Sequence, residues 1–276
     1  MIVQRFAAFS RGDSGGNPAG VVLTQALPSD DLMQRTAADI GYSETVFAAR
    51  AERGWRVRYF APAREIPFCG HATIALGVAL ALAEGDGEFE LTLNDGRVTV
   101  VGDASGGVLR AELRSPPPRS RPATPALVAR ALAVFGYRSE DLDMRLPPAV
   151  MEAGAAHLLL ALRDRTLLER MRYVFEEGRT LMLDAGLATV GLIHAEGSRR
   201  FRARHPFAGG GVYEDPATGA AAAAFAGYLR DLAWPHGGQI EILQGVEMGM
   251  PCEIVASLTP EVGTPVRVSG MVRRLG

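Results

Sequence analysis

The sequence predicts an α+β protein of two similar domains, each a curved, mostly antiparallel sheet wrapped around a central helix. Strand-like segments dominate both halves of the chain. Each half also contains one segment, residues 74–82 or 220–229, that is apolar on nearly every helical face and must be buried all round. Two segments look alike: Arg58 and Arg202 each lie four residues before a proline, with a polar cluster and an apolar helix following. That likeness indicates a duplicated scaffold.

Short strands and two helices account for the first half. Ser29 is a favoured N-cap for a helix to about residue 39, and a second helix over 70–83 stops at Gly85. The segment 94–96, Asn-Asp-Gly, is a typical hairpin turn. Alternating apolar residues between turn signals predict strands at residues 3–9, 21–23, 44–50, 55–60, 88–93, 97–101 and 107–113. We therefore expect an N-terminal domain over residues 1–115.

The proline-rich segment 115–122 separates the two halves. Its four prolines exclude a helix or a central strand, so we predict an interdomain linker. Beyond it, the pattern predicts helices near 125–135, 168–185 and 218–232, and strands at 157–162, 190–195, 200–204, 239–243, 252–258 and 266–275. A C-terminal domain over 123–263 follows, and the last strand, about 264–276, is a candidate to return to the N-terminal domain.

Composition excludes several classes of function. A chain of 276 residues, 47% of them hydrophobic, suits two modest domains. The net charge of −2 gives no reason to expect nucleic acid or an anionic membrane surface as a partner. All 29 basic residues are arginine, which excludes a Schiff-base, pyridoxal-phosphate or P-loop lysine. No apolar run approaches the roughly 20 residues that span a bilayer, and the N-terminus resembles a strand, so we expect a soluble cytoplasmic protein.

The start of the first apolar helix could hold an anion. Gly70 allows a tight entry and His71 falls in the first turn, where free N–H groups and the helix dipole favour negative charge and a neutral imidazole. Equally, His71 could cap the helix or pack in the core. Glu44 begins an otherwise apolar strand and either faces water or, in a desolvated site, serves as acid and base near neutrality.

The second helix start has a different chemistry. Asp215-Pro216 is a good cap and first-turn pair, so a purely structural interpretation is strong there. Thr218-Gly219, followed by five alanines, offers the close backbone approach that a small-anion cradle requires.

Cys69 is either a thiolate base at a helix N-terminus or a small buried residue. Because it lies two residues from His71 at a helix start, we expect the two side chains to point in different directions and not to form a pair. With Cys252 as the only other cysteine, no disulfide scaffold is expected. The other histidines lack metal-ligand spacing, so no metal or cofactor is predicted. These histidines are His157, His194, His205 and His236, and we expect His205 to be structural.

Together these motifs resemble the phenazine-biosynthesis PhzF-like family, within the diaminopimelate-epimerase superfamily. The resemblance covers nearly the whole chain and rests on an ordered set of segments. They are residues 16–23 (GNPAGVVL), 43–47 (SETVF), 60–62 (FAP), 67–73 (PFCGHAT), 214–219 (EDPATG), 244–245 (QG) and 248–251 (MGMP).

The resemblance implies an active site in the cleft between the domains, a homodimer, and an isomerase without cofactor, in secondary-metabolite or antibiotic biosynthesis. Such an enzyme moves a proton between carbons of a conjugated cyclic carboxylic acid and shifts a double bond. By motif, Glu44 carries the proton, and His71 and Asp215 are the other catalytic positions. Backbone N–H groups of Gly70 and Gly219 would hold the substrate carboxylate. Further substrate-binding candidates are Asn17, Ser43, Ala72, Thr218 and Ala220.

Departures from the family pattern leave alternatives open. Racemases of the superfamily carry a cysteine at each helix start, whereas this chain has only Cys69, which disfavours a two-thiol racemase. Ala220-Ala221 replace a usual serine and polar residue, and Met250 replaces an arginine, so the pocket differs in shape and polarity. The alternatives are a racemase or epimerase with Cys69 and Glu44 as opposite bases, and a small-acid binding protein without turnover.

Overall fold

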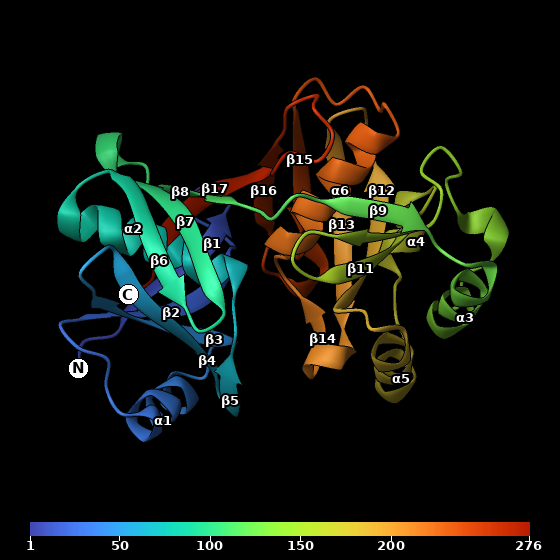
Figure 1. Ribbon diagram of the computed structural model, residues 1–276. Coiled ribbons are helices and arrows are strands. Elements are labelled where there is room, and N and C mark those ends of the chain that lie inside the picture. The colour runs from blue at the N-terminus through green and yellow to red at the C-terminus, as the bar shows by residue number, and fades with distance from the viewer. The chain divides into compact units, whose positions relative to one another are not determined.

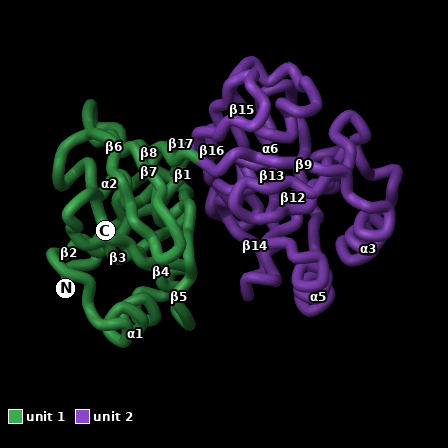
Figure 2. The backbone as a smooth tube through the Cα atoms, viewed as in Figure 1, with its two compact units in different colours: residues 1–114, 269–276 green, residues 115–268 purple.

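The computed structural model describes residues 1–276, which divide into two compact units (Figures 1 and 2). Unit 1 comprises residues 1–114 and 269–276, and unit 2 comprises residues 115–268. The end of the chain therefore belongs to the unit that contains its beginning. None of the helices has both the length and the apolar character needed to cross a membrane.

In unit 1, a mixed sheet surrounds one apolar helix. β2 and β3 are parallel, β4 runs antiparallel to β3 and parallel to β6, and the remaining pairs are antiparallel. The helix α2 packs against β1, β2, β3, β7 and β8, and α1 against β3 and β4. The elements are β1 (Gln4–Ser10), β2 (Asn17–Thr24), α1 (Asp30–Ile40), β3 (Glu44–Arg50), β4 (Trp55–Ala61), β5 (Arg64–Ile66), α2 (Gly70–Glu84), β6 (Gly87–Leu93), β7 (Gly96–Asp103), β8 (Arg110–Arg114) and β17 (Arg267–Arg274).

The central helix of unit 1 is held by close backbone packing. Every residue of α2 from His71 to Ala81 is buried, as its all-round apolar sequence predicts. A Cβ atom built on Gly102 of β7 would lie 2.0 Å from the carbonyl oxygen of Gly77 in α2. The sheet can approach the helix this closely only because both positions are glycine. This contact fixes the depth of α2 in the unit.

Unit 2 repeats the strand pairing of unit 1. β11 and β12 are parallel, β13 is antiparallel to β12 and β14 and parallel to β15, and β15 is antiparallel to β16. Its apolar helix α6 packs against β9, β10, β11 and β16. The elements are β9 (Arg119–Pro122), α3 (Pro125–Phe135), β10 (Ala149–Glu152), β11 (Ala156–Ala161), α4 (Arg165–Glu169), α5 (Phe175–Ala185), β12 (Thr189–Ala195), β13 (Arg200–Phe207), β14 (Val212–Asp215), α6 (Gly219–Asp231), β15 (Gln239–Gln244) and β16 (Cys252–Ser257).

Equivalent ion pairs mark the repeated hairpin before each central helix. Arg58 Nε and Nη2 donate to the two carboxylate oxygens of Glu65 at 2.8 and 2.6 Å, and Arg204 donates in the same way to Glu214 at 2.9 and 2.5 Å. In both hairpins the glutamate pairs across the strands with the residue two positions after the arginine, which is Phe60 in unit 1 and Pro206 in unit 2. The strand register thus matches Arg58 with Arg204, and the predicted match with Arg202 is wrong by two residues.

Buried Arg204 also explains one wrong prediction. The segment expected as a single helix over 168–185 forms two helices, α4 and α5. Arg204 Nη1 donates to the carbonyls of Leu168, Glu169 and Met171. Because those carbonyls are bound by the guanidinium, the chain turns there and the helix ends.

Short strands account for the other differences. The proline-rich segment predicted as a linker contains β9, which pairs antiparallel with β10. β5, β10 and β14 have only three or four residues each, too few to show a period of two. The helices predicted around residues 70–83, 125–135 and 218–232 are present with nearly those bounds.

Candidate functional site

Glu44 is placed by the central strands of unit 1. It is the first residue of β3, opposite Ala19 of the parallel neighbour β2. The next five residues of β3 are buried, so they anchor the strand in the core. Its own side chain is only 15% exposed. Of the two alternatives left open for this carboxylate, the one in which it simply faces water is therefore wrong.

The start of α2 is held by a buried hydroxyl chain. Cys69 is the N-cap residue, and its carbonyl accepts a hydrogen bond from Thr73 Oγ1 at 2.6 Å. The Tyr59 hydroxyl lies 2.7 Å from that same Thr73 oxygen. Burial raises the pKa of Tyr59 far above its ordinary value, so the phenol stays neutral. These bonds fix the helix start to β4.

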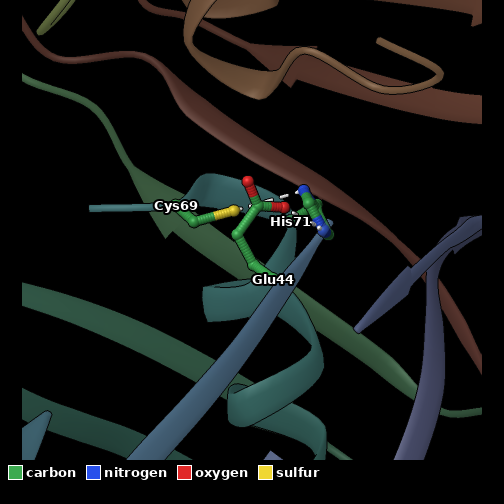
Figure 3. A group of neighbouring side chains, drawn as sticks. All are labelled: Glu44, Cys69 and His71. Atoms are coloured by element: carbon green, nitrogen blue, oxygen red, sulfur yellow. Dashed lines mark hydrogen bonds and ion pairs between the residues drawn. The ribbon is translucent and has the colours of Figure 1, made fainter. Parts of the chain in front are cut away.

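Glu44, Cys69 and His71 form a compact cluster at this helix start (Figure 3). Cys69 Sγ lies 3.2 Å from His71 Nδ1, and His71 Nε2 lies 3.3 Å from Glu44 Oε2. The second contact is an approach without hydrogen-bond alignment, because both buried atoms lack a hydrogen-bond partner. The imidazole thus lies between the thiol and the carboxylate.

The expectation that Cys69 and His71 point apart is wrong. Cys69 has extended backbone angles, φ −142° and ψ 118°, because it is the N-cap and lies outside the helix. The helical rule for residues two apart applies only when both are helical. An extended N-cap residue can turn its side chain back over the first helical turn, and here the thiol meets the imidazole.

The backbone around Gly70 can receive a ligand. No side chain caps α2, and its first turn has no acidic residue. A Cβ atom built on Gly70 would meet nothing within 4 Å, so the space beside it is open. Such a helix start favours an anion. Unit 1 contains three other candidates for substrate binding. The side chain of Ala72 is fully buried, so only its backbone could meet a ligand. Asn17 is buried at the start of β2, and Ser43 is exposed beside Glu44.

Asp215 in unit 2 is part of a tight loop, so the structural alternative, in which it caps the helix, is wrong. It is the last residue of β14, whereas α6 begins at Gly219 with Thr218 as its N-cap. Asp215 Oδ1 accepts from the Ala217 N–H at 3.4 Å and Oδ2 accepts from the Thr218 hydroxyl at 2.7 Å. Ala220 follows in the first turn and is partly buried. The loop therefore presents an ordered carboxylate.

Gln244 is a positioning residue that the site prediction missed. Its side chain is 1% exposed. Its oxygen accepts from the Thr218 N–H at 3.2 Å, and its nitrogen donates to the Asp215 carbonyl at 2.7 Å and to the Thr218 hydroxyl at 3.0 Å. One amide thus connects the whole Asp215–Thr218 loop to β15. The Gln-Gly motif is visible in the sequence, but its spacing from Asp215 and Thr218 does not indicate this contact.

Two other histidines belong to the core of unit 2. His157 Nδ1 and His205 Nδ1 lie 2.8 and 3.0 Å from the same Thr189 hydroxyl. Burial lowers the pKa of His157 to about 4 and, together with the neighbouring His157, that of His205 to about 3. Both imidazoles are therefore neutral at pH 7, which agrees with the structural role predicted for His205.

Only one group of three side chains brings metal-ligand types together, and it is the cluster at the start of α2. The ligand atoms of Glu44, Cys69 and His71 all lie within 4.8 Å of one another. Spacing along the sequence did not indicate it because Glu44 comes from a different element, β3.

Comparison with known proteins points to one class, the isomerases. The chain belongs to the phenazine biosynthesis-like protein family, whose model matches residues 6–272. This agrees with the resemblance seen in the motifs.

Two curated relatives carry isomerase names. An uncharacterized isomerase of Deinococcus radiodurans is 36% identical over 90% of this chain and 83% of its own length. The trans-2,3-dihydro-3-hydroxyanthranilate isomerase of Pseudomonas aeruginosa is 31% identical over 90% of this chain and 87% of its own. Among solved structures, a PhzF-family phenazine biosynthesis protein of Bacillus anthracis has a TM-score of 0.87 at 22% identity, covering 99% of this chain and 96% of that one. The fold of that family is thus shared along the whole chain.

Proposed function

We propose that this protein is a cofactor-independent isomerase that moves a proton, and with it a double bond, within a small unsaturated carboxylic acid. The observation that carries the proposal is the Glu44 carboxylate, which is mostly buried beside the start of α2 and has an oxygen without a hydrogen-bond partner. The isomerase names of the relatives support the reaction class. The second of these names suggests an unsaturated cyclic carboxylic acid as the substrate class, and the family description suggests a role in secondary-metabolite biosynthesis.

The substrate carboxylate is assigned to the helix starts. In unit 1 the N–H groups of Gly70 and Ala72 belong to the uncapped first turn of α2. The corresponding group of unit 2 is the N–H of Gly219, at the start of α6. Free N–H groups and the positive end of the helix dipole both stabilise a carboxylate. In this proposal the start of α2 holds the substrate carboxylate because Glu44 lies beside it, and the start of α6, with Asp215 and Thr218, is a second candidate for binding a polar group.

Glu44 then transfers the proton in two steps. In the first, a C–H bond of the bound acid breaks, an O–H bond forms on Glu44, and the electron pair delocalises through the conjugated system to the carboxylate. The helix N–H groups stabilise this added negative charge. In the second step Glu44 returns the proton to a different carbon, so the double bond has moved and the enzyme is unchanged. The His71 imidazole, whose Nε2 lies 3.3 Å from Oε2, is the group beside this carboxylate and the second catalytic position in the proposal.

The racemase alternative fits the geometry less well. Two bases on opposite faces of one carbon, each roughly 3–3.5 Å from it, lie about 6–7 Å apart. The ligand atoms of Glu44 and Cys69 lie within 4.8 Å. Glu44 and Cys69 are therefore too close together to act as bases on opposite faces of one carbon. Their spacing suits a position on the same face of the substrate, where a proton can leave and return without crossing to the other face.

The test is an incubation of the purified protein in deuterated water with trans-2,3-dihydro-3-hydroxyanthranilate and related dienoic acids, followed by NMR. The proposal expects a product with a moved double bond. Deuterium exchange at a stereocentre without any shift of the double bond would instead support a racemase. Binding of an acid, seen by line broadening, with no exchange at any carbon would support a binding protein.

A further inference from the structure

We propose that Glu44, Cys69 and His71 bind one zinc ion, or another divalent cation with affinity for thiolate and imidazole, in competition with the acid substrate. This goes beyond the isomerase proposal, because it concerns a second ligand at the same side chains. It does not require Glu44 to move a proton, so either proposal can fail without the other.

The three ligand types match zinc. Zinc sites are built from cysteine thiolate, histidine nitrogen and carboxylate oxygen, and this cluster supplies one of each. Thiolate and imidazole together favour zinc or cobalt over magnesium or calcium. A thiolate and a carboxylate carry two negative charges, which balance a divalent cation while the imidazole stays neutral. Three protein ligands leave the fourth position of a tetrahedral ion for water.

The spacing is close to that of a tetrahedral site. Metal–ligand bonds of about 2.0–2.3 Å place tetrahedral ligand atoms about 3.3–3.8 Å apart. Cys69 Sγ and His71 Nδ1 are 3.2 Å apart, and His71 Nε2 and Glu44 Oε2 are 3.3 Å apart. These two contacts use opposite ring nitrogens, of which one ion takes only one, so the third ligand, now within 4.8 Å, must move closer for all three side chains to reach the ion.

Two buried atoms of the cluster point to a missing partner. His71 Nε2 and Glu44 Oε2 are both inaccessible and neither has a hydrogen-bond partner, although the His71 side chain is only 6% exposed. Buried polar atoms normally have partners. A cation between these side chains would satisfy both, since a nitrogen lone pair and a carboxylate oxygen are metal ligands.

The surroundings favour the anionic ligands and fix their position. The positive end of the α2 dipole repels a bare cation. The same dipole stabilises the thiolate and the carboxylate, which are the anionic ligands that bind the cation. The Thr73–Tyr59 hydrogen bonds hold the Cys69 carbonyl, and the sulfur itself already lies 3.2 Å from His71 Nδ1. A zinc ion here would cover Glu44 and thereby exclude the substrate.

The experiment is a titration of metal-free protein with Co²⁺, followed by absorption spectroscopy. We expect saturation at one equivalent, with the visible bands of tetrahedral cobalt and a near-ultraviolet thiolate-to-cobalt charge-transfer band, and displacement by one equivalent of Zn²⁺. Cys69→Ser should abolish the charge-transfer band and weaken binding at least tenfold. Glu44→Gln should weaken binding at least tenfold but retain the band, because the sulfur ligand remains.

Cys252→Ser is the matched control. Cys252 is the other cysteine, fully buried in unit 2, with its thiol on the Met250 carbonyl, so its loss should leave cobalt binding unchanged. Thermal melting by circular dichroism verifies that each variant is folded. A pale six-coordinate cobalt spectrum in the wild type, or a charge-transfer band that persists in Cys69→Ser, would overturn the proposal. Since wild type and Glu44→Gln give independent readouts, the result does not depend on the folding of Cys69→Ser.

Discussion

Acid should weaken unit 2 selectively, because two buried histidines there stay neutral. His157 and His205 both lie in the core and share the Thr189 hydroxyl. Burial lowers the pKa of His157 to about 4 and, with His157 adding to it, that of His205 to about 3. In the unfolded chain both take the ordinary value of about 6.5. Folded and unfolded unit 2 therefore bind protons over different pH ranges.

The sign and size of the effect follow from that difference. Above pH 6.5 both states hold neutral imidazoles, so the histidines leave the free energy of unfolding unchanged. As the pH falls towards 4, only the unfolded chain binds protons, and stability is lost. At pH 5 each unfolded imidazole is nearly fully protonated, which favours unfolding by about 2 kcal/mol, or about 4 kcal/mol for the pair.

One tryptophan in each unit makes the measurement possible. Trp55 lies in unit 1 and Trp234 in unit 2, so Trp55→Phe leaves fluorescence that reports on unit 2 alone. Urea unfolding of this variant at pH 7.5 and pH 5 should show the loss of about 4 kcal/mol. His205→Asn keeps a hydrogen-bonding atom near Nδ1 but cannot be protonated, and should remove about half of the pH dependence. An equal pH dependence with and without His205 would refute the reasoning.

Three further substitutions test the scaffold and the loop. Gly102→Ala should lower the melting temperature strongly because the new Cβ would lie 2.0 Å from the backbone of α2, while Gly87→Ala, with nothing within 4 Å, should change it little. Glu214→Gln leaves a buried guanidinium without its carboxylate and should destabilise the protein by about 3–5 kcal/mol in urea unfolding; a loss below about 1 kcal/mol would show that the pair is not desolvated. Gln244→Ala removes the acceptor of the Thr218 N–H, so hydrogen exchange at that amide should accelerate; unchanged protection would mean that the loop is held by other contacts.

Much of the fold could be predicted because its signals are local. The helices α2 and α6 are apolar on all faces, and burial on all faces is what the structure shows. The missed strands β5, β10 and β14 are too short to carry a period. The break between α4 and α5 depends on Arg204, which comes from β13 and is remote in sequence, so no local pattern could reveal it.

The site shows the same division between local and remote contacts. The family resemblance singled out Glu44 and His71, which their own surroundings left ambiguous, and the structure brings them together with Cys69. The thiol–imidazole contact is the opposite of the prediction, because Cys69 is an N-cap residue and the spacing rule for two helical residues does not apply to it. Gln244 was missed as a positioning residue because its partners are contacts formed only by folding.

The most direct test of the proposed function compares Glu44→Gln with Glu52→Gln in deuterated water, with the acid that the wild type isomerises. Glu52 is an exposed carboxylate in unit 1, so its variant matches the chemical change without touching the site. If Glu44 carries the proton, Glu44→Gln should lose isomerisation by about 10²–10⁴-fold while Glu52→Gln keeps it. Isomerisation and deuterium incorporation undiminished in a folded Glu44→Gln protein would contradict the account.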